Sequence, residues 1–178
     1  MAEEKKESWL NYLALTTVIL AVCATLATFK GGSYSTRSVL SQSMASDQWA
    51  YYQAKSLKGY LYEIQKEGME HELVERENSM SPAGAEALKA RMASYGNKIG
   101  KYDSEKAEIM KEARRLEEIR DDAQKHQQSF GIAVIFLQIG ILLSSIAALM
   151  KKKPIWYIGL AVGSCGLFYF VNGFFLFV

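Results

Sequence analysis

Three long apolar stretches constrain this chain more strongly than any other feature of its sequence. They cover residues 9–29, 130–150 and 155–178, and none of them contains Asp, Glu, Lys, Arg or His. Because a helix needs about 20 apolar residues to cross the hydrocarbon core of a bilayer, the sequence predicts three transmembrane helices. Their lack of internal charge removes the usual mark of an ion or proton pathway.

The charges beside these stretches predict their orientation. Three lysines and Pro154 make up the short turn 151–154 between the second and third stretches. Short loops rich in lysine favour the cytoplasmic side, so we expect this turn and the N-terminal segment 1–8 to be cytoplasmic. The segment 30–129 is then periplasmic. Basic residues also flank that segment, which leaves the inverted orientation open.

The segment 30–129 has the pattern of a long helical hairpin. It contains 16 Lys or Arg and 16 Asp or Glu, and this balance argues against a nucleic-acid partner, which needs a basic surface. A turn signal at 78–81 is followed by Pro82, and proline suits the first position of a helix. We therefore expect two helical arms, residues 35–77 and 82–129, that fold antiparallel onto each other with facing residue numbers that sum to about 161.

A seven-residue repeat runs through the second arm and indicates a coiled-coil seam. Its positions, spaced alternately four and three residues apart, are Leu88, Met92, Tyr95, Ile99, Tyr102, Lys106, Ile109, Ala113, Leu116, Arg120, Ala123, Gln127 and Phe130. The first arm has a shorter seam of the same spacing, formed by Ala50, Ala54, Leu57, Leu61 and Ile64. The register also places Asp47 near Arg114 and Arg115, which predicts an ion pair between the arms.

These patterns together predict an all-α membrane protein. It has three transmembrane helices, with a long antiparallel coiled-coil hairpin inserted between the first and the second. The hairpin is the extramembrane part of the chain, and the third transmembrane helix follows the second after the basic turn.

The stretch SDQWAYYQAKS, residues 46–56, places aromatic side chains among polar ones. On a helical wheel, aromatic residues flank the seam of the first arm on both sides. One facing helix covers only one flank, so the pattern favours a second copy of the chain as a further partner. The candidate interface residues are Trp49, Tyr51, Tyr52, Tyr60 and Tyr62. The alternative is that the tyrosines lie over the flanks of the hairpin with their hydroxyls in water.

Small residues in the apolar stretches indicate further helix contacts. The third stretch contains Gly159 and Gly163, and the first repeats small residues at coiled-coil spacing, as Ala14, Thr17, Ala21, Ala24 and Thr28. Because small residues let membrane helices approach closely, both sets are candidates for an oligomer interface. For the two glycines, contact with another span of the same chain is the alternative.

The sequence shows no arrangement of residues that indicates catalysis. His71 and Glu75 share one helix face, but a third metal ligand is not evident. We interpret His126 as an interface residue at the predicted membrane entrance. Gln138 and Asn172, the amides well inside the last two stretches, are placed to hydrogen-bond to each other. We therefore expect a protein that is not an enzyme, with no cofactor and no metal.

The sequence resembles an uncharacterised family of bacterial inner-membrane proteins, described only as a domain of unknown function. The shared pattern is a first span, the core SDQWAYYQAK, a charged helical stretch and two last spans joined by a basic turn. The resemblance covers nearly the whole chain and implies a bacterial inner-membrane protein. The resemblance implies that the signature positions of the family are Asp47, Trp49, Tyr52, Gln53 and Lys55. It assigns no activity or ligand to them.

The sequence favours a non-enzymatic membrane protein whose copies associate through the first span and the hairpin. The resulting assembly would be a membrane-anchored oligomeric stalk or scaffold. Its expected partners are the lipid bilayer, further copies of itself and an unidentified protein that meets the hairpin. The alternative is a channel in which the first span of each subunit lines a central pore, although the apolar stretches supply no charged rings for one.

Overall fold

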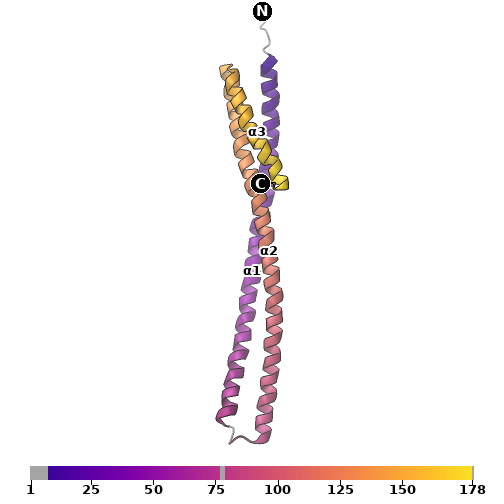
Figure 1. Ribbon diagram of the computed structural model, residues 1–178, viewed down its shortest axis with the longest axis vertical. Coiled ribbons are helices and arrows are strands. Elements are labelled where there is room, and N and C mark those ends of the chain that lie inside the picture. The colour runs from indigo at the N-terminus through magenta and orange to yellow at the C-terminus, as the bar shows by residue number, and fades with distance from the viewer. Residues whose placement is uncertain (1–7, 77–78, 178) are drawn as a thin grey trace, which may run out of the picture. The chain divides into compact units, whose positions relative to one another are not determined.

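The computed structural model describes residues 8–76 and 79–177, and the regular structure of these residues is entirely helical. Three helices follow one another, α1 Ser8–Glu75, α2 Pro82–Met150 and α3 Lys153–Phe175 (Figure 1). All three are long and apolar enough to cross a membrane. The all-helical class and the three candidate spans are therefore confirmed. The predicted N-terminal segment 1–8 and the predicted turn 78–81 lie partly outside the described residues.

Helix α1 unites two elements that the sequence analysis treats as separate. The predicted first span, 9–29, and the predicted first arm, which begins near residue 35, form one unbroken helix. Gly31 and Gly32 lie inside it, and neither has a positive φ. Helix α2 likewise joins the predicted second arm to the predicted second span, as its continuous heptad repeat indicates.

The start of α2 follows its capping signal. The Oγ of Ser81 accepts a hydrogen bond from the backbone N–H of Gly84 at 3.2 Å, which is the geometry of an N-cap. Pro82 occupies the first helical position, where its missing N–H leaves no donor unsatisfied. These residues begin α2 at the position that the sequence predicts.

The turn between α2 and α3 is built by lysines. Lys151 has φ 51°, in the left-handed region, and its N–H donates to the carbonyl of Ala148 at 3.4 Å. The N–H of Lys152 donates to the carbonyl of Ala147 at 3.2 Å. This Schellman-type arrangement gives donors to carbonyls at the end of α2. Helix α3 then begins at the next residue, with Pro154 in its first turn.

The chain divides into two compact units. Unit 1 contains Met1–Leu40 and Ile119–Val178, and unit 2 contains Ser41–Glu118. Unit 1 therefore holds the predicted spans of α1 and α2 together with the whole of α3. Unit 2 holds the intervening parts of α1 and α2.

The larger apolar cluster of unit 1 lies where all three helices meet. Partly buried side chains of α3, among them Leu167 and Phe170, pack against a core of buried side chains from α1 and α2. The buried members of that core are Leu20, Ala24, Ala27, Phe130, Ala133 and Leu137. The three candidate spans of unit 1 thus form one packed bundle.

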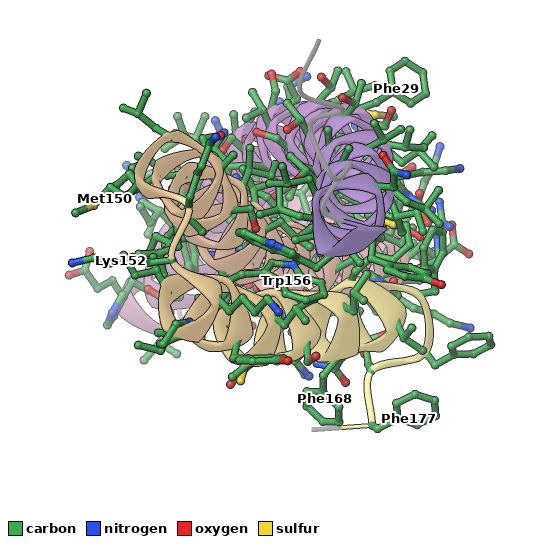
Figure 2. All side chains as sticks on the ribbon, turned by 90° about the horizontal axis from the view of Figure 1, so that it is seen from above. Phe29, Met150, Lys152, Trp156, Phe168 and Phe177 are labelled. Carbon is green, nitrogen blue, oxygen red and sulfur yellow. The ribbon has the colours of Figure 1, made fainter. Side chains whose placement is uncertain are left out.

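A second apolar cluster of unit 1 lies beside the lysine turn. It joins Trp9 and Leu13 of α1 to Ala147 of α2 and Trp156 of α3. Figure 2 shows Trp156 among the helices, whereas Phe29, at the far end of the first apolar stretch, points outward. Tryptophan is enriched where membrane helices meet the polar interface, which fits the position of this cluster at the ends of the candidate spans.

In unit 2, the segments of α1 and α2 pack side by side (Figure 1). The seam positions that the sequence predicts on α2 are all buried or partly buried in this unit, from Leu88 to Leu116. Ala45 of α1 and Ala113 of α2 are almost completely inaccessible. Helix α2 thus turns its heptad face toward α1, and small residues on both helices let their axes approach closely.

Candidate functional site

The aromatic motif of α1 is used within unit 2 to hold α2. The indole N–H of Trp49 donates to Oε1 of Glu117 at 2.9 Å, and the ammonium group of Lys55 donates to Oε2 of Glu105 at 2.5 Å. Tyr52 packs edge-on against the ring of Trp49, with centroids 5.6 Å apart. As the residue number on α1 increases from 49 to 55, that of the partner on α2 decreases from 117 to 105, as expected for the predicted antiparallel register. The Trp and Lys of the motif are therefore links between two helices of one chain.

The ammonium group of Lys55 lies among a carboxylate and two aromatic rings. It is 5.2 Å from the ring centroid of Tyr51 and 5.5 Å from that of Tyr102. The hydrogen bond to Glu105, with a smaller contribution from Tyr51, raises the pKa of Lys55. The same hydrogen bond lowers the pKa of Glu105. Each partner favours the charged form of the other, so the pair is ionised at neutral pH.

Three tyrosines form a further contact between the two helices. The ring centroid of Tyr62 lies 5.2 Å from that of Tyr95 and 5.9 Å from that of Tyr102. The ammonium group of Lys98 lies 4.8 Å from the centroid of Tyr62, within the range of a cation–π interaction. Tyr62 therefore belongs to the contact between α1 and α2 within the chain.

The five aromatic interface candidates fall into two groups. Trp49, Tyr52 and Tyr62 are partly buried in unit 2, whereas Tyr51 and Tyr60 are 50% and 56% exposed. The last two present much of their surface to solvent in the single chain. The other three are occupied mainly by contacts within the unit.

The predicted seam of the first arm is wrong. Leu57, Leu61 and Ile64 are 62%, 53% and 64% exposed, and Ala50 and Ala54 are exposed as well. The face of α1 that packs on α2 instead contains Ala45, Tyr52, Lys55, Gly59 and Tyr62. We call the exposed Leu57, Leu61 and Ile64 the apolar stripe of α1.

Close approach explains why α1 turns this other face to α2. Gly59 is buried, and a Cβ at its position would lie 3.9 Å from the Cβ of Tyr102, in ordinary van der Waals contact. The distance between two helix axes depends on the side chains at the contact, so glycine and alanine bring the helices together. That proximity lets Trp49 and Lys55 reach carboxylates on α2. As a consequence, the leucines of α1 stay exposed.

The predicted ion pair of Asp47 is not formed. Arg115 pairs with Glu112 of its own helix, through Nη2–Oε1 at 2.6 Å and Nε–Oε2 at 2.8 Å. The hydrogen bonds from Arg115 lower the pKa of Glu112. Of the ion pairs in the described part of the chain, none joins Asp47 to Arg114 or Arg115. A partner one turn away on the same helix is always within reach, and here Arg115 pairs with Glu112 and not with Asp47.

Gly159 and Gly163 contact other helices of unit 1. A Cβ on Gly159 would lie 3.2 Å from the carbonyl oxygen of Gly140, and a Cβ on Gly163 would lie 2.9 Å from Cδ1 of Leu20. Both glycines are buried. Helix α3 uses them to approach α2 and α1. The two glycines therefore contact other spans of the same chain and are not open to a second copy.

The small residues predicted on the first span are also divided by the fold. Ala24 is buried in the larger cluster and Thr17 is partly buried, whereas Ala14, Ala21 and Thr28 are exposed. The predicted face therefore straddles the boundary between the core of unit 1 and its outer surface. Of the five predicted residues, only the exposed Ala14, Ala21 and Thr28 are open to an intermolecular contact.

Asn172 has a partner that the sequence analysis missed. Its Nδ2 donates to the Oγ of Ser129 at 3.2 Å, and both side chains are buried. Gln138, the predicted partner, is exposed. The prediction paired the two amides by depth in the membrane, but it had no information on which helix face each side chain occupies.

His126 joins all three helices of unit 1. Its Nδ1 lies 2.8 Å from the carbonyl oxygen of Gly173 on α3, and its ring stacks on Tyr34 of α1 with centroids 4.4 Å apart. Its Nε2 lies 3.8 Å from a carboxylate oxygen of Asp122, one turn earlier on α2. The predicted interface residue is therefore a junction between helices. In the described residues, no group of three or more His, Cys, Asp or Glu side chains is placed to hold a metal ion.

The fold and these contacts define a class, an all-helical protein with three candidate membrane-spanning helices and aromatic and charged links between its long helices. The chain belongs to the family Domain of unknown function (DUF4337), whose model matches residues 9–176. The match includes nearly all of the described residues, and it confirms the expectation of an uncharacterised family. No curated protein and no solved structure matches the chain.

Proposed function

We propose that this protein is a non-enzymatic scaffold of the bacterial inner membrane whose copies associate through unit 2. The observation that carries the proposal is the apolar stripe of α1, which lies exposed between the predicted spans. More than half of the surface of each of its three side chains is uncovered. Because full burial of such a side chain contributes about 1.5–3 kcal/mol, a partner that covers the stripe is strongly favoured.

In the described part of unit 2, the exposed large apolar side chains all lie on one helix. Its part of α1 carries the stripe with Tyr51 and Tyr60 on the two flanks, whereas the described residues of α2 in this unit include no exposed large apolar side chain. Single exposed apolar residues are normal on protein surfaces. The stripe differs from them because, with Ala50 and Ala54, it keeps coiled-coil spacing along one face.

A second copy of α1 is the partner that suits this stripe. A heptad face is complementary to the same face of another copy about a two-fold axis. The flanking positions on either side carry Gln53, Lys58, Gln65 and Glu67, which together have no net charge. Pairing two copies therefore buries leucine and isoleucine without gathering charges of one sign.

In this arrangement, unit 2 is an antiparallel coiled-coil hairpin outside the membrane, and the spans anchor it. We place the lysine turn and the N-terminus in the cytoplasm and the hairpin in the periplasm, following the distribution of lysine in short loops. The rings of Trp9 and Trp156 lie 6.1 Å apart, and Lys153 lies 5.9 Å from Trp9, which supports an interfacial position for this end of unit 1. The paired hairpins form a stalk that offers a surface to another protein.

A pore lined by the first span is the second candidate function, and it has less support. In unit 1, the exposed surface of α1 includes the large apolar side chains of Val18, Val22 and Leu26. The hydroxyls of Thr25 and Thr28 donate to carbonyls of their own helix, so their hydrogens are already engaged within the chain. A pore lining offers polar groups to water and ions, whereas this surface suits lipid.

The mass of the purified full-length protein in mild detergent, measured by native mass spectrometry, tests the proposal. We expect a discrete oligomer for the wild type and a monomer for the triple variant in which Leu57, Leu61 and Ile64 are replaced by Gln. The triple variant should keep its helical circular dichroism, because the stripe makes little contact within the chain. A monomeric wild type would contradict the proposal.

The matched control is Val74→Gln. Val74 is 73% exposed on the same helix, but it lies outside the stripe. This variant should keep the mass of the wild type, because the exposed apolar side chain that it loses lies on a different face. If the triple variant and the control both remain oligomeric, association does not use the stripe, and another surface must hold the copies together.

A further inference from the structure

A groove in unit 1 lies at the boundary between the polar and apolar parts of α2. It has a volume of about 510 Å³ and is formed by α2 and the end of α3. Its polar lining comes from the last turn before the predicted second span and from Asn172 of α3, and its apolar lining comes from within the two spans. Self-association through unit 2 makes no use of it.

The walls of the groove are held in place by hydrogen bonds. Asn172 donates to Ser129 across the two helices, and the carbonyl of Asn172 accepts from the N–H of Leu176 at 2.7 Å. One residue further along α3, the carbonyl oxygen of Gly173 lies 2.8 Å from Nδ1 of His126. Both sides of the groove are thus fixed before anything binds, which lowers the entropic cost of binding.

The polar end of the groove is rich in hydrogen-bond donors. It contains the ammonium group of Lys125, the amide of Gln128 and the hydroxyl of Ser129. Ser129 is buried, and its Oγ accepts a hydrogen bond from Nδ2 of Asn172. Helix α3 contributes no acidic residue to the other wall. Hydrogen-bond donors beside a cation suit a phosphate oxygen.

The rest of the groove is apolar. Ile132, Tyr169 and Leu176 line it, and the ring of Tyr169 is held by parallel stacking on Phe136, with centroids 6.0 Å apart. Both linings continue into the candidate membrane spans of α2 and α3. A ligand that fills the groove therefore needs an anionic head and a hydrocarbon tail.

We infer that this groove binds an anionic phospholipid, with the phosphate at Lys125, Gln128 and Ser129 and an acyl chain along Ile132 and Tyr169. The lipid lies in the leaflet at the C-terminal end of α3. A free phosphate ion would use the donors but would leave the apolar lining unused. A neutral, zwitterionic lipid would fill the apolar lining but would carry a second cation toward Lys125.

The test measures the affinity of the full-length protein in mild detergent for short-chain phosphatidylglycerol, by native mass spectrometry. We expect phosphatidylglycerol to bind with a lower Kd than phosphatidylcholine of the same chain length. Replacing Lys125 by Gln should raise the Kd for phosphatidylglycerol about tenfold, because a charge-assisted hydrogen bond is lost. Lys125 is exposed, so this variant keeps its fold.

The matched control is Lys30→Gln. Lys30 is an exposed lysine that directly follows the first apolar stretch, as Lys125 shortly precedes the second, but it does not line the groove. It should leave the Kd unchanged. An equal loss in both variants would overturn the inference, because it would show general attraction to a charged surface. Equal affinity for the two lipids would overturn it too. So would displacement of phosphatidylglycerol by millimolar inorganic phosphate, since the site would then hold a free anion.

Discussion

The indole N–H of Trp49 and the carboxylate of Glu117 are joined by a 2.9 Å hydrogen bond between residues that are 68 positions apart in the chain. The bond crosses from α1 to α2 inside unit 2. Together with the pair formed by Lys55 and Glu105, it fixes how far one helix is shifted along the other. Two residues of the aromatic motif therefore set a register that apolar contacts alone would leave loosely specified.

Removing the indole donor tests the strength of this link. Trp49→Phe keeps an aromatic ring but leaves the partly buried Glu117 without its hydrogen bond, so it should lower the free energy of unfolding by about 1–3 kcal/mol. Chemical denaturation followed by circular dichroism measures the loss. In the background Glu117→Gln, the same substitution should cost less, because the two residues act as a pair. Strictly additive effects would show that they do not interact.

The pair of Lys55 and Glu105 predicts a pH dependence of stability. The lowered pKa of Glu105 means that its contribution is present above its ordinary value of 4.5 and is lost as the pH falls through the lowered value. The raised pKa of Lys55 means that its contribution is present below 10.5 and is lost as the pH rises through the raised value. The melting temperature of the wild type should therefore exceed that of Glu105→Gln most clearly near neutral pH.

Thermal unfolding of the two proteins across the pH range measures this difference. It should shrink in acid, because the carboxylate that distinguishes them becomes protonated. Glu86→Gln is the control, since Glu86 is exposed and forms no ion pair in the described part of the chain. A difference that persists unchanged below the lowered pKa would show that charge on Glu105 is not its cause.

The packing of α3 predicts opposite effects for two glycine substitutions. A Cβ on Gly166 would lie 2.8 Å from the backbone nitrogen of Leu137, which cannot move aside as a side chain can. Gly166→Ala should therefore cost about 1–3 kcal/mol. Gly131→Ala meets nothing within 4 Å and should add about 0.5–1 kcal/mol by favouring helix. Melting temperatures in one detergent compare the two, and a tolerated Gly166→Ala would refute the close contact.

The lysine turn predicts a stabilising substitution. Lys151 has φ 51°, a conformation in which a Cβ is unfavourable and glycine is preferred. Lys151→Gly should raise the stability of the protein by about 1 kcal/mol. Lys152→Gly is the comparison, because Lys152 has φ −111° and gains nothing from glycine. We expect a higher melting temperature for the first variant and an unchanged or lower one for the second.

Much of the fold follows from local sequence signals. Ser81 and Pro82 predict where α2 begins, and the uncharged stretches predict three helices able to cross a membrane. The long heptad repeat predicts which face of α2 is buried in unit 2, because in residues 82–118 one set of positions holds nearly all of the large apolar residues. These features are local or periodic, so they need no knowledge of the partner helix.

The face of α1 and the partners of its motif were decided by the tertiary structure. Two faces of α1 compete in unit 2, one with Leu57, Leu61 and Ile64, and one with Gly59 and Lys55. Apolar periodicity favours the first, but the second lets the helices approach closely and reach carboxylates on α2. Of the acidic residues in the segment, no local signal marks Glu105 and Glu117 as those partners. A choice between faces depends on what the other helix presents, and a single helix sequence does not contain that information.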